Sequence, residues 1–418
     1  MVQMSEIRKL TIEEIPEFVK IVINAYPGFA QPTQEYFEQF SKRLIELQQN
    51  GETIEFYGLF REGKLLGGMR LHQFKMNLFR TMIDVGGVGL VAVDLLHKKE
   101  KVAKELIQFF IEHFKEKQNS LALLYPFRPD FYYQMGFGHG TKMNHYSLSP
   151  SSFPSTVSKE GLIFLHSSHK ELIQDCYHQY VLNHHGMIEK TNQDLEMMFR
   201  NDRDQLIGFL QDGLLEGYMI FSLQKSNDEN FLHHDLVIKE WIYHNPAALQ
   251  KMSTFLHSQA DQVHRVIINT PDPSLEFFVQ DARNGTNRLI PSVYHETNTA
   301  GTGLMYKIIN LDQFIDQLKG VHFGGENCRF RLKIEDSFLT NLTLHISLKK
   351  GKMEVCEISK VDFEIGINIS DLSSLFMGAI DVMSLYNYGK LKINKVEHLD
   401  TLKEMFRFMN KPICFKGF

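Results

Sequence analysis

The sequence predicts two mixed α/β domains in tandem, followed by a smaller α+β domain. Three observations support this fold class. Strand and helix patterns alternate over the first 150 residues, and much the same order restarts after the Ser/Pro-rich stretch 147–158. A second polar stretch, 296–303, precedes a strand meander with short helices. The 418 residues suit two to four domains, and we expect three, at 1–150, 151–295 and 296–418.

The first domain opens with antiparallel strands and an early helix. Apolar residues at helical spacing predict a helix over 13–25, which Pro27-Gly28 ends. A turn at 61–64 joins two strands as a hairpin. The expected strands are 7–10, 54–60, 65–79, 82–93 and 121–125, and further helices are expected at 98–117 and 130–135.

The second and third domains follow from the same patterns. In the second, Asn245 and Pro246 fit the cap and first position of a helix that runs to about residue 262. Its other expected elements are strands at 162–166, 206–222, 236–243 and 266–268 and a helix at 170–183. The third should contain strands at 305–309, 330–334, 342–348 and 352–358 and helices at 311–318, 371–377, 380–385 and 399–408.

Composition and charge exclude several classes of protein. A net charge of −5 argues against a general nucleic-acid binder, because phosphate neutralisation needs a basic surface. The longest apolar stretch, 85–93, is half a membrane span, and the N-terminus lacks the apolar core of a signal peptide. The 4 cysteines show no metal spacing, so we expect reduced thiols in a cytoplasmic protein. The 19 histidines include no metal-binding motif, and we expect no metal.

The junction between the strand at 82–93 and the following helix is a candidate ligand site. The strand contains Gly86, Gly87 and Gly89, and glycine in a strand usually marks a bulge or a close approach of backbone or ligand. The helix start is basic, and free N–H groups at a helix start favour a pyrophosphate. Unpaired strand groups could bind an extended amide chain such as pantetheine. The alternative is an ordinary solvated basic surface.

Two tyrosines in the short helix at 130–135 are candidate acids. A phenol can protonate a departing thiolate, since its reference pKa lies near that of a thiol. The alternative is structural: one of Tyr132 and Tyr133 packs in the core with its hydroxyl satisfied, and the other is exposed.

Taken in order, these motifs resemble the Gcn5-related N-acetyltransferase (GNAT) family. Over its full length the chain resembles the Eis-like (enhanced intracellular survival) acetyltransferases, in which two acetyltransferase domains precede a sterol-carrier-like domain. The resemblance rests on His97-Lys98-Lys99 with Ala103, on Phe131-Tyr132 before Gly136-Phe137-Gly138, on Lys239-Glu240-Trp241 before Asn245-Pro246, and on Asp371-Leu372 before Phe376-Met377-Gly378.

The resemblance implies a reaction and a set of site residues. The family transfers an acetyl group from acetyl-coenzyme A (acetyl-CoA) to a primary amine by direct attack. On that pattern Tyr132 is the general acid, and the C-terminal carboxylate of Phe418 is the general base. The cofactor-binding residues would be the backbone of Val91 and Val93 for pantetheine, and Lys98, Lys99, Lys101 and Ala103 for the diphosphate. Expected partners are a small-molecule or lysine amine and further copies of the chain, as a trimer or hexamer.

The sequence departs from the family pattern at the diphosphate loop. The family usually has glycine where this chain has Lys101, and glycine permits close backbone approach to phosphate. Glu100 beside it would repel phosphate unless it points away, and Gly417 stands where relatives can carry an acidic residue.

Two alternatives to a working enzyme remain. One is a decayed GNAT protein that acts as an oligomeric scaffold. The other is a binding protein whose third domain holds an acyl lipid in a tunnel lined by Phe330, Phe338, Leu342, Leu344, Phe363, Leu372, Leu375 and Phe376, although these residues could equally fill an ordinary core.

Overall fold

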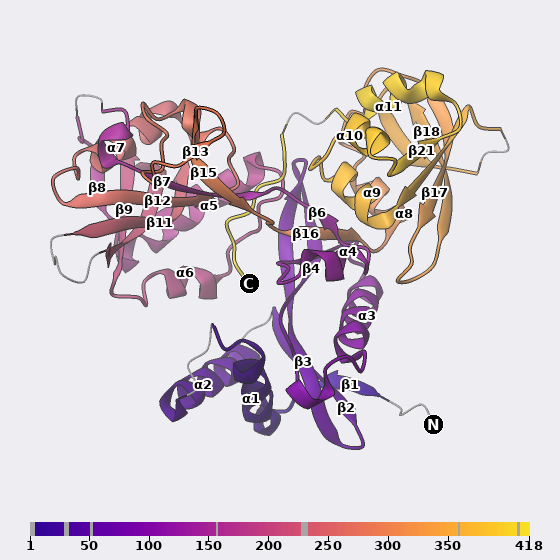
Figure 1. The fold of residues 1–418 in the computed structure, drawn as a ribbon, viewed down its shortest axis with the longest axis horizontal. Helices are drawn as coiled ribbons and strands as arrows, with labels where there is room; N and C mark the ends of the chain where they lie inside the picture. The colour runs from indigo at the N-terminus through magenta and orange to yellow at the C-terminus, as the bar shows by residue number, and fades with distance from the viewer. Residues whose placement is uncertain are drawn as a thin grey trace. The chain divides into compact units, whose positions relative to one another are not determined.

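The structure is a computed structural model that describes residues 5–28, 33–50, 53–155, 158–226, 233–357, 360–407 and 410–418. The chain forms two compact units. The first contains Met1–Gly140, Leu304–Met409 and Gly417–Phe418, and the second contains Thr141–Gly303 and Asn410–Lys416. Figure 1 shows the elements of both units, which are described separately below.

The first unit is built on a seven-stranded sheet in the order β1-β2-β3-β4-β5-β16-β6. All neighbouring strands are antiparallel except β4 and β5, which are parallel. The strands are β1 (Glu6–Lys9), β2 (Ile54–Arg61), β3 (Lys64–Leu78), β4 (Thr81–Val93), β5 (Leu121–Leu124), β6 (Gly138–His139) and β16 (Met305–Ile308). The expected strands of the first domain are therefore present, and one strand comes from much later in the chain.

Helices cover both faces of this sheet (Figure 1). On one face α3 packs through side chains such as Phe110 and Phe114, and on the other α1 packs through Phe18 and Val22. The helices are α1 (Ile15–Ala25), α2 (Gln34–Asn50), α3 (Val102–Glu116) and α4 (Pro129–Tyr133). Helix α2 was not predicted from the sequence, although Leu44 and Leu47 form a buried stripe on it.

Helix α3 begins four residues later than the sequence pattern suggested. Lys101 has φ +66° and Lys99 has φ +68°, both in the left-handed region, which a right-handed helix cannot contain. Residues 98–101 therefore form a loop that leads into the helix.

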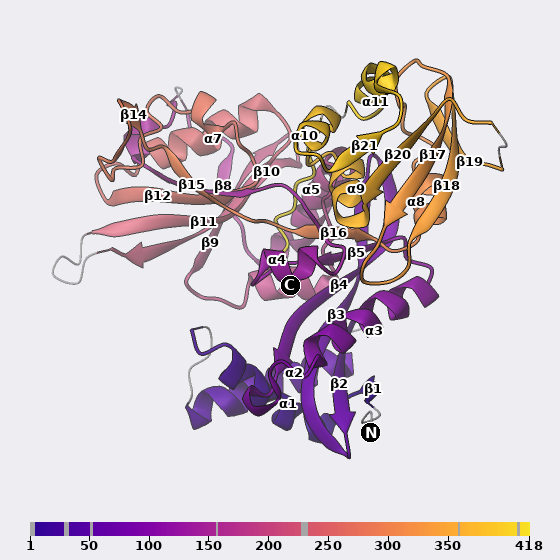
Figure 2. The ribbon, with the colours of Figure 1, turned by 45° about the vertical axis from the view of Figure 1, so that its right-hand side comes forward.

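The last domain contributes a five-stranded sheet to the first unit, in the order β19-β18-β17-β20-β21. Its strands are β17 (Cys328–Glu335), β18 (Leu342–Lys349), β19 (Lys352–Val355), β20 (Phe363–Asn368) and β21 (Leu391–Ile393), and its helices are α8 (Leu311–Gln317), α9 (Ile369–Phe376), α10 (Val382–Asn387) and α11 (Leu399–Met405). Figure 2 shows α9 between this sheet and β16. The approach is close: a Cβ on Gly138 would lie 2.0 Å from the Ser370 carbonyl oxygen.

A second seven-stranded sheet, β15-β7-β12-β11-β10-β9-β8, forms the second unit. Its strands are β7 (Met143–Leu148), β8 (Leu162–Phe164), β9 (Asp204–Gln211), β10 (Leu214–Lys225), β11 (His234–Tyr243), β12 (Val263–Thr270) and β15 (Asn298–Gly301). Its helices are α5 (Lys170–Asn183), α6 (Asn192–Met198) and α7 (Pro246–His257), and a small hairpin joins β13 (Leu289–Ile290) to β14 (Tyr294–His295). Asn245 caps α7 as expected, because its side chain accepts a hydrogen bond from the Ala248 N–H.

The two polar stretches expected to be linkers carry strand residues in this unit. The first, 147–158, includes the end of β7 and the fully buried Phe153. The second, 296–303, includes β15, which pairs with β7. The domain boundaries at 150 and 295 remain predictions. No helix in the described part of the chain is long and apolar enough to cross a membrane.

Candidate active site

The first sheet opens between β4 and β5. The two strands pair only over Gly86–Val88 and Ala122–Leu124, while β4 continues to Val93. The register between β3 and β4 also shifts, so that Gly68 faces Ala92 but Arg70 faces Gly89. This bulge places Leu90 at φ +48°. Beyond Val88, the edge of strand β4 that faces β5 is therefore not paired with β5, and a ligand or another segment of the chain can approach it.

A cavity of about 720 Å³ lies beside this open part of β4 and the start of α3. Its volume is typical of small-molecule and cofactor sites, which span about 300–1,000 Å³. All 6 residues expected to bind the cofactor line it: Val91, Val93, Lys98, Lys99, Lys101 and Ala103. Other lining residues were not predicted from the sequence to bind the cofactor, and one of them, Phe338, was instead a candidate for a lipid tunnel. They include Tyr26, Lys104, Phe127, Arg128, Ser337 and Phe338.

The start of α3 offers N–H groups to this cavity. The first hydrogen bond of the helix runs from the Glu105 N–H to the Lys101 carbonyl oxygen, at 3.0 Å. The N–H groups of 102–104 thus precede the helical hydrogen-bond ladder, and the Lys101 side chain does not cap them. Because residues 102–104 all line the cavity, an anion there would meet both these N–H groups and the lysines.

Glu100 is turned to other partners. Its carboxylate lies 3.1 Å from His97 Nδ1 and 3.5 Å from Arg61 Nη1. Arg61 also donates to the Glu100 carbonyl oxygen, at 3.1 Å, and to Glu105, at 2.8 Å. Glu100 is absent from the described cavity lining; of its two partners, Arg61 also lies outside that lining, whereas His97 belongs to it.

Tyr26 connects the end of α1 to the bulged strand. Its hydroxyl donates a hydrogen bond of 2.6 Å to the carbonyl oxygen of Val91, and burial raises the pKa of this phenol. The sequence led us to expect that the Val91 backbone contacts pantetheine. In the structure its carbonyl oxygen already accepts the hydrogen bond from Tyr26. The only feature of the sequence that could have drawn attention to Tyr26 was its position directly after a predicted helix and before Pro27-Gly28.

Tyr132 and Tyr133 lie in different surroundings. Tyr132 is 3% exposed, in the core beneath two aromatic wall residues, with ring centroids 5.7 Å from Phe127 and 5.2 Å from Phe131. Burial, with a smaller effect of Tyr26, raises the pKa of Tyr132 well above its ordinary value. Tyr133 instead donates a hydrogen bond of 2.7 Å to Asp371 of α9.

The C-terminal residue occupies the open side of β4. The Phe418 ring lies 4.9 Å from that of Phe74 and 5.2 Å from that of Tyr125, which directly follows β5. A Cβ on Gly89 would lie 3.1 Å from the carboxyl carbon of Phe418, so a side chain here would require the chain end to shift by a few tenths of an ångström. Gly89 precedes Val91 by two residues, about 7 Å along a strand. The carboxyl group of Phe418 and the Val91 backbone expected to contact pantetheine thus lie along the same strand, β4.

Arg70 places a half-buried guanidinium near the chain end. Its Nη2 would lie 3.3 Å from a Cβ on Gly89. Its Nε is buried without a hydrogen-bond partner among the described residues. Burial, with a smaller effect of Arg43, lowers the pKa of Arg70 to about 10. A group of three or more His, Cys, Asp or Glu side chains that could hold a metal ion does not occur in the described residues.

Family models match three successive parts of the chain. Residues 6–140 and 186–308 each match an acetyltransferase (GNAT) domain, and residues 311–415 match a sterol carrier protein domain. The chain therefore consists of two GNAT acetyltransferase domains followed by a sterol carrier protein domain, which confirms the predicted fold class. No curated protein sequence matches the chain.

Solved structures share this architecture over almost the whole length. A GCN5-related N-acetyltransferase from Anabaena variabilis is 17% identical, with a TM-score of 0.81, and the match covers 99% of this chain and 100% of that one. A probable N-acyltransferase from Enterococcus faecalis is 20% identical, with a TM-score of 0.77 and 100% of both chains covered. Eis1 from Mycobacterium abscessus is 14% identical, with a TM-score of 0.77 and 99% and 100% covered. The expected Eis-like arrangement is confirmed in fold.

The cavity's charge and shape suit coenzyme A, the cosubstrate that GNAT domains generally use. Lysines and free N–H groups gather at the start of α3, where phosphates would bind. Valines and phenylalanines line much of the rest together with polar residues such as Gln134 and Ser337, and this mixed lining suits the amide-bearing pantetheine arm.

Proposed function

We propose that the protein transfers an acetyl group from acetyl-CoA to a primary amine. One observation carries this proposal: the residues expected to bind the cofactor line one cavity on β4, and the C-terminal carboxyl group lies at Gly89 of the same strand. The two GNAT domains and the acyltransferase-like folds of the solved relatives agree with acyl transfer.

The chain's own residues supply the proton transfers. The Phe418 carboxylate would accept a proton from the acceptor ammonium, directly or through water, so that the amine nitrogen can bond to the thioester carbon. As the carbon–sulfur bond breaks, Tyr132 would donate its phenolic proton to the departing thiolate, and the resulting phenolate would regain a proton from the newly acylated nitrogen, directly or through water. The raised pKa of Tyr132 keeps the phenol protonated at neutral pH, the form in which it can donate. Acetyl-CoA supplies the activated acetyl group.

The basic loop and α3 would hold the cofactor's phosphates. Lys98, Lys99 and Lys101 provide positive charge, and the N–H groups of 102–104 provide directed donors. Because Glu100 pairs with His97 and Arg61, the repulsion that the sequence suggested is reduced.

The interior of the third domain supports a scaffold role over a lipid-binding role. Phe330, Leu372, Leu375 and Phe376 surround a cavity of only about 10 Å³, roughly the space of one water molecule. Of the other residues proposed for a tunnel, Leu342 is 47% exposed and Phe338 lines the cofactor cavity instead. An acyl lipid would have to push this packed core apart.

The proposal is tested by binding and turnover with the full chain. Acetyl-CoA should raise the melting temperature and be consumed in the presence of at least one amine from a panel of aminoglycosides, polyamines and lysine peptides. Tyr132→Phe should lower turnover by about 100-fold while leaving cofactor affinity unchanged. Neither stabilisation nor turnover with any amine would count against the proposal.

The base is tested separately at the chain end. Deleting Phe418, or adding residues after it, should reduce turnover sharply without lowering the melting temperature by more than a few degrees. A matched control is a tag at the N-terminus, which should leave turnover intact. If an enzyme with an extended C-terminus keeps full turnover, Phe418 is not the base.

A further inference from the structure

A loop of the third domain reaches the cofactor cavity of the first. It follows β17, which ends at Glu335, and its residues Ser337 and Phe338 line the cavity together with Gln134 and Met135 from the end of α4. The Ser337 hydroxyl donates to the Gln134 carbonyl oxygen, at 3.4 Å. Phe338 and Leu339 also pack on the apolar core of the first domain. The wall is thus shared by two domains of the same unit.

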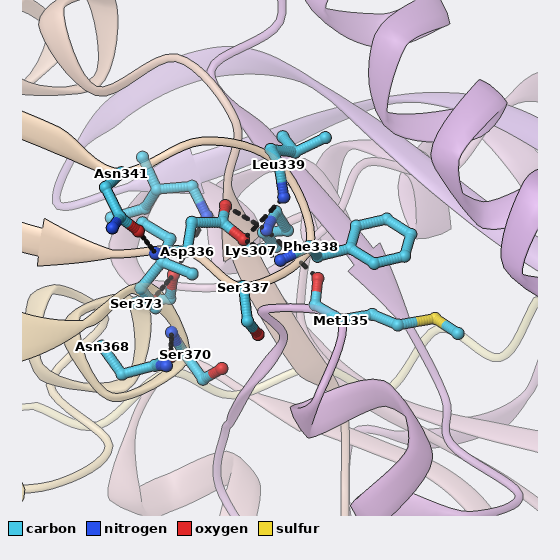
Figure 3. Close-up of polar contacts among 12 residues, drawn as sticks. Met135, Lys307, Asp336, Ser337, Phe338, Leu339, Asn341, Asn368, Ser370 and Ser373 are labelled. Carbon is cyan, nitrogen blue, oxygen red and sulfur yellow. Dashed lines mark hydrogen bonds and ion pairs between the residues drawn. The ribbon is translucent and has the colours of Figure 1, made fainter.

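A buried ion pair holds this loop in place, as Figure 3 shows. Lys307 of β16 is completely buried, and its ammonium donates to Asp336 Oδ2, at 2.7 Å, and to the Met135 carbonyl oxygen, at 3.1 Å. A buried ammonium is costly unless it is fully paired. The space is also tight, because a Cβ on Gly136 would lie 2.0 Å from Lys307 Nζ. One side chain therefore links β16, the end of α4 and the loop.

The other oxygen of Asp336 orders the loop itself. Asp336 Oδ1 accepts hydrogen bonds from the N–H groups of Phe338, at 3.0 Å, and Leu339, at 3.1 Å. The Asn341 side chain accepts from the Asp336 N–H, at 2.9 Å. The carboxylate thus fixes both where the loop sits and how its backbone turns.

The Phe338 ring lies next to the basic end of the cavity. Lys104, in the first turn of α3, places its ammonium 5.6 Å from the ring centroid, and Lys307 places its own at 5.8 Å on the buried side. An aromatic ring beside lysines and helix N–H groups matches the nucleotide end of coenzyme A, which joins a purine to phosphates.

We propose that the sterol-carrier-like domain completes the cofactor site, with Phe338 contacting the nucleotide part of coenzyme A and the Lys307–Asp336 pair positioning Phe338. This inference rests on the proposed use of acetyl-CoA. It gives the third domain a part in cofactor binding in addition to carrying the chain end.

Calorimetric titration with coenzyme A and with S-acetylpantetheine, which lacks the nucleotide, tests the contact. Phe338→Ala should weaken coenzyme A binding about tenfold and change S-acetylpantetheine binding little, while Phe338→Tyr should keep the affinity. Leu339→Ala is the matched control, since Leu339 shares the loop and the core packing but does not line the cavity. It should leave coenzyme A binding unchanged.

The positioning pair is tested by Asp336→Asn, which keeps the shape and the acceptor but removes the charge. Weaker coenzyme A binding with an unchanged S-acetylpantetheine affinity is expected. If Asp336→Asn does not fold, Phe338→Ala still decides the contact. Equal coenzyme A affinity in the wild type and Phe338→Ala overturns the inference, as does an equal loss for both ligands. A wild type that binds no coenzyme A contradicts the proposed function instead.

Discussion

Lys101 adopts a backbone conformation that favours glycine. The resemblance to the GNAT family predicts glycine at this position, and the structure has a lysine with φ +66°, in the left-handed region. Such a conformation costs an L-residue about 1–2 kcal/mol relative to glycine. The loop therefore carries a strained residue just before α3, and this lysine adds a charge to the cavity.

Lys101→Gly should therefore stabilise the protein. We expect a gain of about 0.5–1 kcal/mol, since the relief of the left-handed strain exceeds the greater entropy of the unfolded chain. Urea denaturation followed by circular dichroism measures it. Lys98→Gly is the control: Lys98 has φ −63°, so glycine there relieves no strain and should destabilise slightly. Equal effects of both changes would contradict the argument.

The buried phenol of Tyr132 leads to a prediction about pH. Burial raises its pKa above the ordinary value of about 10, so the phenol keeps its proton through the mildly alkaline range. Turnover at saturating substrates should not decline between about pH 8 and about pH 10 through loss of this acid. Initial rates across that range test it. A decline in turnover that is present in the wild type and absent in Tyr132→Phe would show that the pKa of Tyr132 lies within this pH range, and would contradict the prediction.

At the level of elements, three glycines of strand β4 each allow another part of the protein to approach the strand closely. A Cβ on Gly86 would lie 2.3 Å from the ring of Phe114 in α3, and one on Gly87 would lie 2.5 Å from Phe74. Gly89 leaves room for the carboxyl group of Phe418. The sequence indicated a bulge or close approach here because three glycines interrupt one strand, and the structure confirms both.

Gly89→Ala should separate chemistry from cofactor binding. A methyl group 3.1 Å from the carboxyl carbon of Phe418 and 3.3 Å from Arg70 Nη2 would displace the chain end. We expect kcat to fall by up to about 10-fold, because the carboxyl group would move by a few tenths of an ångström, less than the shift of about 1 Å that costs about 100-fold. Coenzyme A affinity, measured by calorimetry, should change little. Gly366→Ala is the control, since its nearest neighbour would lie at an ordinary 3.7 Å, and full turnover in Gly89→Ala would contradict the placement of the base.

At the scale of the whole molecule, local patterns predicted most elements but not the long-range pairings. Basic residues after a glycine-rich strand identified the cavity wall, because strand, loop and helix start are consecutive in the chain. Tyr26 was missed and Phe338 was assigned to a lipid tunnel instead, since folding alone brings both to that wall from other parts of the chain. A strand at 305–309 was expected and β16 is present, yet its place between β5 and β6 of the first sheet depends on pairings across more than 160 residues, which no local signal carries.

This pairing makes the first domain dependent on the chain that follows the second. Strand β5 is buried throughout, and on the side away from β4 it pairs with β16 over four residues, while β6 pairs with β16. Without β16, buried backbone groups of β5 would lose their partners, which is costly. We therefore expect residues 1–140 expressed alone to be insoluble or unfolded, and residues 304–418 expressed with them to form a soluble complex that co-purifies. The matched control is a shorter fragment, residues 311–418. It lacks residues 304–310, which comprise β16 and three flanking residues, and it should recover little soluble 1–140. Equal recovery with both partners, measured by affinity capture and circular dichroism, would show that docking of α9 and not strand insertion holds the unit together.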